Sequence, residues 1–161
     1  MGLGRLSAAG PVHWGTAAEV ELLLLLRVVA AGALAAVVGW EREHAGKAAG
    51  FRTHMLVGMA AALYTAIGTL EFNDAAARPD GLRADPIRVI QAVALGIGFL
   101  GSGVIRTAKD SGEVLGLTTA ASIWATAAIG IAAGFGRFFL AAGATMLLAL
   151  VLHLFPRIER Q

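Results

Sequence analysis

The residues with the most capacity for chemistry lie in one short charged segment, residues 41–54. The segment contains Glu41, Arg42, Glu43, His44, Lys47, Arg52, Thr53 and His54, with long apolar runs on both sides. Side chains of these types could form a polar network folded against a helix bundle, or a solvated loop that anchors the chain at a membrane surface. His44 and His54 lie ten positions apart across glycines, which fits no common metal-ligand spacing. We therefore favour the network and the loop over a metal site.

A second set of ionisable residues centres on Arg27, which interrupts an apolar run. Ionisable side chains within a membrane span are costly and mark function or a partner, unless they reach the interface by snorkelling. An antiparallel return of the chain brings Glu71 and Asp85 to the same end of the bundle, so either is the expected partner. Their carboxylates, whose oxygens suit hard cations, are also weak candidates for a metal site. Arg88 and Gln91 complete this second polar layer.

Small residues dominate a third segment and comprise Gly96, Gly98, Gly101, Ser102 and Gly103. The segment contains a literal G-x-G-x-x-G, but a dinucleotide site requires this motif between a strand and a helix of a soluble βαβ unit. We expect instead that the small residues let neighbouring helices approach closely. This predicts that the third span is the central, tightly surrounded helix.

Hydroxyl side chains follow at helical spacing in the next apolar segment: Thr118, Thr119, Ser122 and Thr126. Hydroxyls in membrane helices commonly hydrogen-bond to a neighbouring helix, and we expect these to do so. Lining a polar path through the bundle is the alternative.

The composition places these residues in a membrane. The 161 residues are 57% hydrophobic and 15% charged, with a mean hydropathy of +0.72, whereas soluble domains average about 25% charged residues. The formal net charge of +2 gives no reason to expect nucleic-acid binding, and the absence of cysteine excludes disulfides and thiolate metal sites.

The apolar runs predict an all-α, polytopic transmembrane bundle of about five spans. These are residues 18–40, 55–70, 87–105, 117–133 and 138–155, with Pro156 ending the last. Gly46 and Gly50 should break the helix that continues from the first span. Residues 71–85 form the expected linker, and Asp85 followed by Pro86 predicts the start of the third helix. Residues 1–17 are then an N-terminal segment, residues 18–156 the membrane domain and residues 157–161 a short tail.

Lysines and arginines in the loops set the expected orientation. One side holds Arg42, Lys47, Arg52, Arg106, Lys109, Arg157 and Arg160, and the other holds Arg5, Arg78, Arg83, Arg88 and Arg137. This bias predicts an N-terminus outside, in the periplasm, and a cytoplasmic C-terminus.

The same segments resemble the signatures of the MgtC/SapB family. The motifs are GWERE at 39–43, KAAGFRTHMLV at 47–57, DPIR at 85–88, GIGFLGSGVI at 96–105 and GLTTAASIW at 116–124. They occur in the order typical of the family, with Phe51 and Ser102 where leucine and alanine are expected. The resemblance implies a multi-pass bacterial inner-membrane protein. Virulence-associated members, linked to growth in low magnesium, also carry a C-terminal ACT-like domain, which we do not expect in this sequence.

We therefore predict a non-enzymatic regulator linked to magnesium or ion homeostasis or to membrane energetics. Its expected partners are the lipid bilayer and other membrane proteins, with magnesium and a second copy of the chain as further candidates, and no cofactor or nucleic acid. The alternative is a cation (magnesium) transporter or channel. An intramembrane enzyme is a remote third hypothesis, because its nucleophile and base would be Ser102 and His153, which lie on different spans.

Overall fold

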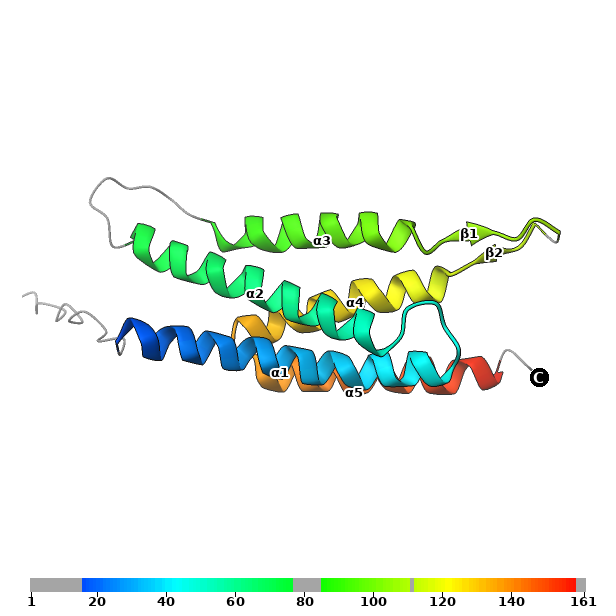
Figure 1. Cartoon of the computed structure of the whole chain (residues 1–161), viewed down its shortest axis with the longest axis horizontal. Coiled ribbons are helices and arrows are strands. Elements are labelled where there is room, and N and C mark those ends of the chain that lie inside the picture. The colour runs from blue at the N-terminus through cyan, green and yellow to red at the C-terminus, as the bar shows by residue number, and fades with distance from the viewer. Residues whose placement is uncertain (1–15, 77–84, 111, 159–161) are drawn as a thin grey trace, which may run out of the picture.

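The computed structural model describes residues 16–76, 85–110 and 112–158. Within these residues the chain forms five helices and one short hairpin. The elements are α1 (Ala17–His44), α2 (Phe51–Ala76), α3 (Pro86–Ser102), β1 (Arg106–Thr107), β2 (Val114–Leu115), α4 (Leu117–Gly134) and α5 (Phe138–Ile158). Successive helices lie side by side and alternate in direction (Figure 1). The predicted all-α bundle is confirmed.

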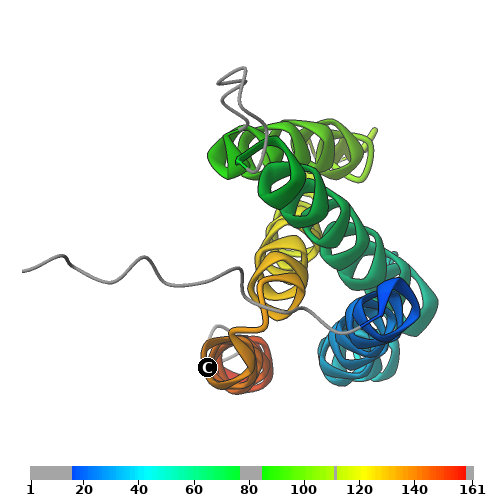
Figure 2. The same ribbon diagram turned by 90° about the vertical axis from the view of Figure 1, so that its left-hand side faces the viewer.

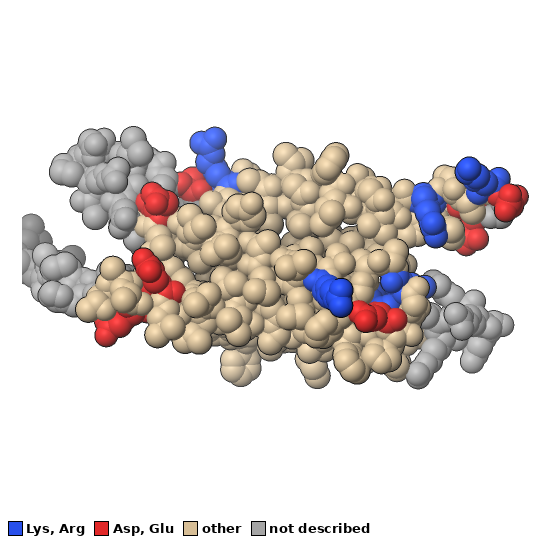
Figure 3. Space-filling view, in the orientation of Figure 1, with Lys and Arg blue, Asp and Glu red and all other residues tan. Residues whose placement is uncertain are grey.

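The surface of the bundle fits a membrane. By length and composition α1, α4 and residues 51–72 of α2 could each cross a bilayer, and α3 and α5 contain shorter apolar stretches. In Figure 3, charged side chains gather at the two ends of the molecule and uncharged residues form a wide belt between them. Phe139 on α5 is 99% exposed and Phe99 on α3 is 84% exposed. Large apolar side chains exposed in such a belt are typical of a surface that faces lipid.

The first helix is longer than predicted and includes part of the charged segment. It continues to His44 and stops where Gly46 adopts a positive φ of 66°. The Gly46 N–H donates to the Glu43 carbonyl and the Lys47 N–H donates to the Arg42 carbonyl, both at 3.0 Å. This pair of bonds is the Schellman motif, which favours glycine at that position. The predicted break at Gly46 is confirmed.

The second helix is also longer than predicted. It begins at Phe51 and extends to Ala76, so the first part of the expected linker is helical, while residues 77–84 lie outside the described residues. Most of the N-terminal segment and residues 159–161 of the tail also lie outside them.

The start of α3 is as predicted. The Asp85 carboxylate accepts the Ile87 N–H at 2.9 Å and Pro86 occupies the first helical position. The antiparallel hairpin of β1 and β2, with Arg106 opposite Leu115, was not predicted. Each strand has two residues, too few to produce a recognisable alternation in the sequence.

The tightest packing joins α1, α2 and α4, and glycines on α2 and α4 make it possible. A Cβ at Gly58 would lie 2.6 Å from the Cβ of Ala35 on α1, and one at Gly130 would lie 2.4 Å from the carbonyl oxygen of Gly58. One turn further along α4, a Cβ at Gly134 would lie 2.8 Å from the carbonyl oxygen of Ala62. These helices therefore approach nearly to backbone contact.

The prediction that α3 is the central helix is wrong. The central helix is α4, which contacts all four other helices, and Figure 2 shows α3 at one edge of the bundle. Added Cβ atoms at Gly96 and Gly98 would meet nothing within 4 Å, while Gly101 approaches Ala120 of α4. Ser102 donates to a carbonyl of its own helix, and Gly103 is the C-cap. Small residues permit close packing, but they do not determine whether another helix lies beside them.

Replacement of Gly130 by leucine should prevent α2 and α4 from packing. The new side chain would overlap the Gly58 backbone, which cannot move without separating the helices, so we expect a loss of about 3 kcal/mol or more of unfolding free energy. Gly143→Leu on α5 is the matched control because an added Cβ there meets nothing within 4 Å. Unfolding in mixed detergent micelles measures both variants, and equal stabilities would contradict the packing described here.

Candidate functional site

A polar cluster joins four helices at the end of the bundle where α1 ends and α2 begins. We define it as Glu41, Arg42, Glu43, His54 and Ser122. The first three belong to the last turn of α1, His54 to the first turn of α2 and Ser122 to α4. The cluster reaches α5 through a backbone carbonyl. The charged segment is therefore part of the bundle, although Lys47 and Arg52 on it are exposed and Thr53 is half-buried.

Arg42 is the centre of this cluster and is fully buried. Its Nε and Nη2 donate to the two carboxylate oxygens of Glu41 at 2.5 and 2.7 Å. This two-point geometry is the strong form of an arginine–carboxylate interaction. The Glu41 side chain is only 18% exposed, so the pair is largely withdrawn from solvent. Each charge therefore depends on the other, because an unpaired charge in such surroundings is costly.

The second partner of Arg42 explains why α5 is attached at this end. Nη2 of Arg42 also donates to the carbonyl oxygen of Leu152 on α5 at 3.1 Å. In a regular helix this carbonyl accepts from the N–H four residues later, but residue 156 is a proline and has no N–H. The guanidinium therefore supplies the hydrogen bond that the proline removes. Sequence reasoning missed this contact, although Pro156 marks the carbonyl that lacks a donor.

Glu43 connects the end of α1 to the start of α2. Its carboxylate accepts the backbone N–H of Phe51 at 2.8 Å, and α2 begins at Phe51. The first N–H groups of a helix have no intrahelical partner and favour negative charge nearby. A Cβ at Gly50 would lie 2.8 Å from a carboxylate oxygen of Glu43, so glycine there leaves room for this cap. The adjacent His44 ring bonds the Trp40 carbonyl on the outside of α1.

His54 and Ser122 form a buried link between α2 and α4. The Nδ1 atom of His54 lies 2.9 Å from the Gly50 carbonyl oxygen, and Nε2 lies 3.1 Å from the Ser122 hydroxyl. Since a carbonyl only accepts hydrogen bonds, Nδ1 carries a hydrogen. A serine beside a histidine is also the arrangement of a nucleophile and its base. Here, however, His54 is 0% exposed and Ser122 is 1% exposed, so the geometry fits a structural link.

Two hydroxyls of α4 donate within their own helix. Ser122 donates to the Thr119 carbonyl and Thr126 to the Ser122 carbonyl, both at 2.8 Å. Thr119 and Thr126 are buried, whereas Thr118 is exposed. The predicted helix-helix hydrogen bonding therefore holds for Ser122, which contacts His54 of α2, whereas Thr126 bonds a carbonyl of its own helix.

Arg27 has a partner on another helix, but it is not the one predicted. Its Nη1 donates at 3.1 Å to the carbonyl oxygen of Gly134, the last residue of α4. A Cβ at Gly136, where φ is 74°, would lie 3.2 Å from Cζ of Arg27. The guanidinium thus lies against the negative end of the α4 dipole. The expected pairing with Glu71 or Asp85 is wrong, because an unpaired helix-end carbonyl takes the place of a carboxylate.

The predicted second polar layer does not assemble around Arg27. Glu71 and Gln91 are exposed, and Asp85 is the cap of α3. Arg88 lies on α3 and borders an apolar groove between α2 and α3. In residues 16–76, 85–110 and 112–158, no group of three or more His, Asp or Glu side chains is placed to bind a metal ion.

Comparison with known proteins identifies relatives across most of the chain. A family model described as the MgtC family matches residues 28–161. The chain is 39% identical over 141 residues, 88% of its length, to the Escherichia coli K12 protein named "Putative magnesium transporter YhiD". It is 38% identical over 143 residues to protein SrpB of Synechococcus elongatus, covering 85% of this chain and 77% of SrpB. No solved structure matches.

Coverage of the relatives is partial. The chain spans 62% of YhiD. It is 37% identical over 118 residues to protein MgtC of Brucella abortus, which is 73% of this chain and 45% of that protein. The family model covers α2 to α5 and most of α1.

Loss of the Arg42 side chain should destabilise the bundle more than loss of any exposed arginine. Arg42→Met leaves the Glu41 carboxylate and the Leu152 carbonyl without donors, and breaking a buried pair on one side costs about 3–5 kcal/mol. Arg52→Met is the matched control because Arg52 is exposed in the same segment and should change stability by less than about 0.5 kcal/mol. Unfolding in mixed micelles measures both variants.

A double-mutant cycle tests the cause of that loss. Adding Glu41→Gln to Arg42→Met should recover part of the lost stability, because the second substitution removes the stranded charge. Strictly additive effects would show that the two side chains are not coupled.

Proposed function

The chain belongs to the MgtC family, and we propose that it is a non-enzymatic membrane regulator of magnesium or ion homeostasis. In this proposal it acts through contacts with other membrane proteins in the bilayer. The transmembrane bundle is the part that binds these partners, and it does not itself carry an ion.

The observation that supports this proposal is that the polar side chains of the cluster bond to one another and to backbone carbonyls. Arg42 is bonded to Glu41 and Leu152, and His54 to Gly50 and Ser122, although Nη1 of Arg42 has no partner among the described residues. A path for a hydrated cation requires polar groups that face a continuous wet cavity. The cavity between α2 and α3 is instead lined almost entirely by apolar residues.

The surface of α3 supports contact with a partner inside the membrane. Leu95 is 80% exposed and Phe99 is 84% exposed, and the two lie four residues apart on one side of α3. Large exposed apolar side chains gathered on one face are typical of a contact surface for another protein. We therefore place the protein contact on this face of α3.

For location, we propose the bacterial inner membrane with the N-terminus outside and the C-terminus in the cytoplasm. Arg42, Lys47, Arg52, Arg106 and Lys109 all lie at the end of the bundle where α1 and α3 end and α2 and α4 begin. An excess of lysine and arginine in short loops is typical of the cytoplasmic side.

Magnesium transport is the second candidate function. It is favoured by the name of the Escherichia coli relative, and it would require a carboxylate that binds the cation. Among the residues singled out from the sequence, Asp85 at the start of α3 is the best placed for this role, since it is exposed at the end of the bundle.

Magnesium flux distinguishes the two candidates. The purified chain in proteoliposomes loaded with a magnesium-sensitive dye should give no saturable uptake above that of empty vesicles. Saturable uptake that Asp85→Asn abolishes, while Asp110→Asn in the hairpin leaves it intact, would overturn the regulator proposal and support transport.

The α3 surface provides a direct test of the regulator proposal. In a bacterial strain that lacks its own MgtC-family gene and grows poorly at low magnesium, Phe99→Ser should abolish rescue by the chain at unchanged stability. Met146→Ser on α5 is the matched control, because Met146 is 71% exposed on a different helix. Equal rescue by both variants would show that this face of α3 binds no partner.

A further inference from the structure

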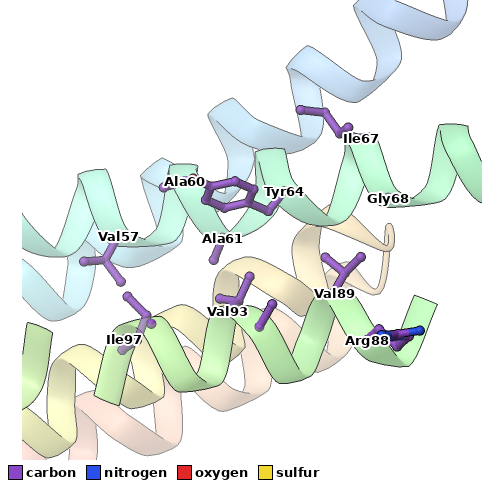
Figure 4. Close-up of a pocket in the computed structure, with 12 residues that line it drawn as sticks. Val57, Ala60, Ala61, Tyr64, Ile67, Gly68, Arg88, Val89, Val93 and Ile97 are labelled. Atoms are coloured by element: carbon purple, nitrogen blue, oxygen red, sulfur yellow. The ribbon is translucent and has the colours of Figure 1, made fainter. Parts of the chain in front are cut away.

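An apolar groove of about 660 Å³ separates α2 from α3. Figure 4 shows Tyr64, Ala61 and Val57 on the α2 side, with Val93 and Ile97 opposite them on α3. Most of its walls are apolar, and Arg88 lies at one end. The size falls within the range of cavities that hold small molecules, about 300–1,000 Å³.

The groove lies beside a close contact between the two helices. A Cβ at Gly68 would lie 2.7 Å from a methyl group of Val89, so the helices are in close contact there. Further along α3, Ala92 and Gly96 leave the space unfilled, and an added Cβ at Gly96 would meet nothing within 4 Å. The small residues that we expected to pack against a helix instead open this groove.

The length of the groove matches one leaflet of a bilayer. The lining residues of α3 run from Arg88 to Ile97, nine residue steps or about 13.5 Å along a helix. Half of the hydrocarbon core is about 15 Å. Arg88 lies in the first turn of α3, so its guanidinium is at the depth of the headgroups when the apolar part lies among acyl chains.

Arg88 is available to an anionic group at that depth. Its side chain is exposed, and none of the carboxylates in the described part of the chain lies within ion-pair distance of it. Guanidinium groups bind phosphate through two parallel hydrogen bonds. A cation at the interface above an apolar groove one leaflet long is complementary to a molecule with a phosphate at one end and an acyl chain at the other.

We propose that this groove is a binding site for an anionic phospholipid, with one acyl chain between α2 and α3 and the phosphate bound by Arg88. This site does not depend on the regulatory role proposed above. A lipid held there would complete the packing of α3 on the side that faces α2.

Native mass spectrometry of the full chain tests the site. The protein is released from micelles containing equimolar dioleoylphosphatidylglycerol and dioleoylphosphatidylcholine, and the retained lipids are counted. Both lipids carry a phosphate, but the choline cation of phosphatidylcholine lies beside it and opposes the Arg88 guanidinium. We therefore expect phosphatidylglycerol to be retained about tenfold more than phosphatidylcholine. Arg88→Gln should remove most of this preference, whereas Arg137→Gln, an exposed arginine at the same end of the bundle, should keep it.

Filling the groove tests the acyl-chain part of the proposal. Gly96→Leu and Ala92→Leu should each reduce retention of both lipids several-fold, while Gly143→Leu on α5 should not. If Arg88→Gln and Arg137→Gln lowered the preference for phosphatidylglycerol equally, the preference would come from general surface charge, and the proposed site would be overturned. Unchanged retention in both filling variants would also overturn it. So would a dimer that Gly96→Leu disrupts without loss of lipid, because the occupant would then be a second copy of the chain.

Discussion

The structure depends on the need to give every backbone carbonyl in a membrane a hydrogen-bond donor. The last carbonyls of every helix lack an intrahelical donor, and two carbonyls without one lie beside arginines of α1. On α4 the Gly134 carbonyl is at the C-terminal end, and on α5 the Leu152 carbonyl is opposite a proline. Arg27 and Arg42 of α1 donate hydrogen bonds to them. Since a buried carbonyl without a donor is costly, these two arginines help to fix how α4 and α5 lie against α1.

This arrangement also resolves the problem of placing arginine in a membrane protein. A guanidinium has five N–H donors and needs acceptors for most of them. Arg42 obtains them from Glu41 and Leu152, although its Nη1 has no partner among the described residues. The same contacts that make the charge tolerable therefore join the helices. Loss of either partner would leave a buried polar group without a hydrogen bond. This loss costs more free energy than the intact bond contributes.

The sequence predicted the helices well and their packing poorly. Apolar runs and the pair Asp85 and Pro86 identify five helices, because these signals are local. The predicted partners of Arg27 were wrong. Carboxylates can be identified directly in a sequence, whereas a carbonyl without a donor must be inferred from a nearby helix end or proline. The prediction of the central helix was also wrong. Gly130 and Gly134 form a G-x-x-x-G on α4, the spacing typical of close helix contacts. The prediction instead chose α3 because its glycines are more numerous.

The division of the bundle into two parts follows from these contacts. Buried polar bonds join α1, α2, α4 and α5, and glycines bring α1, α2 and α4 close together, so a change in one of these helices must strain the others. Helix α3 contacts α2 near Gly68 and α4 near Gly101, and none of the polar bonds of the cluster involves it. Its position is therefore set by apolar packing against α2 and α4. A ligand or partner that binds beside α3 would act on this apolar packing, while the polar cluster joins the other four helices.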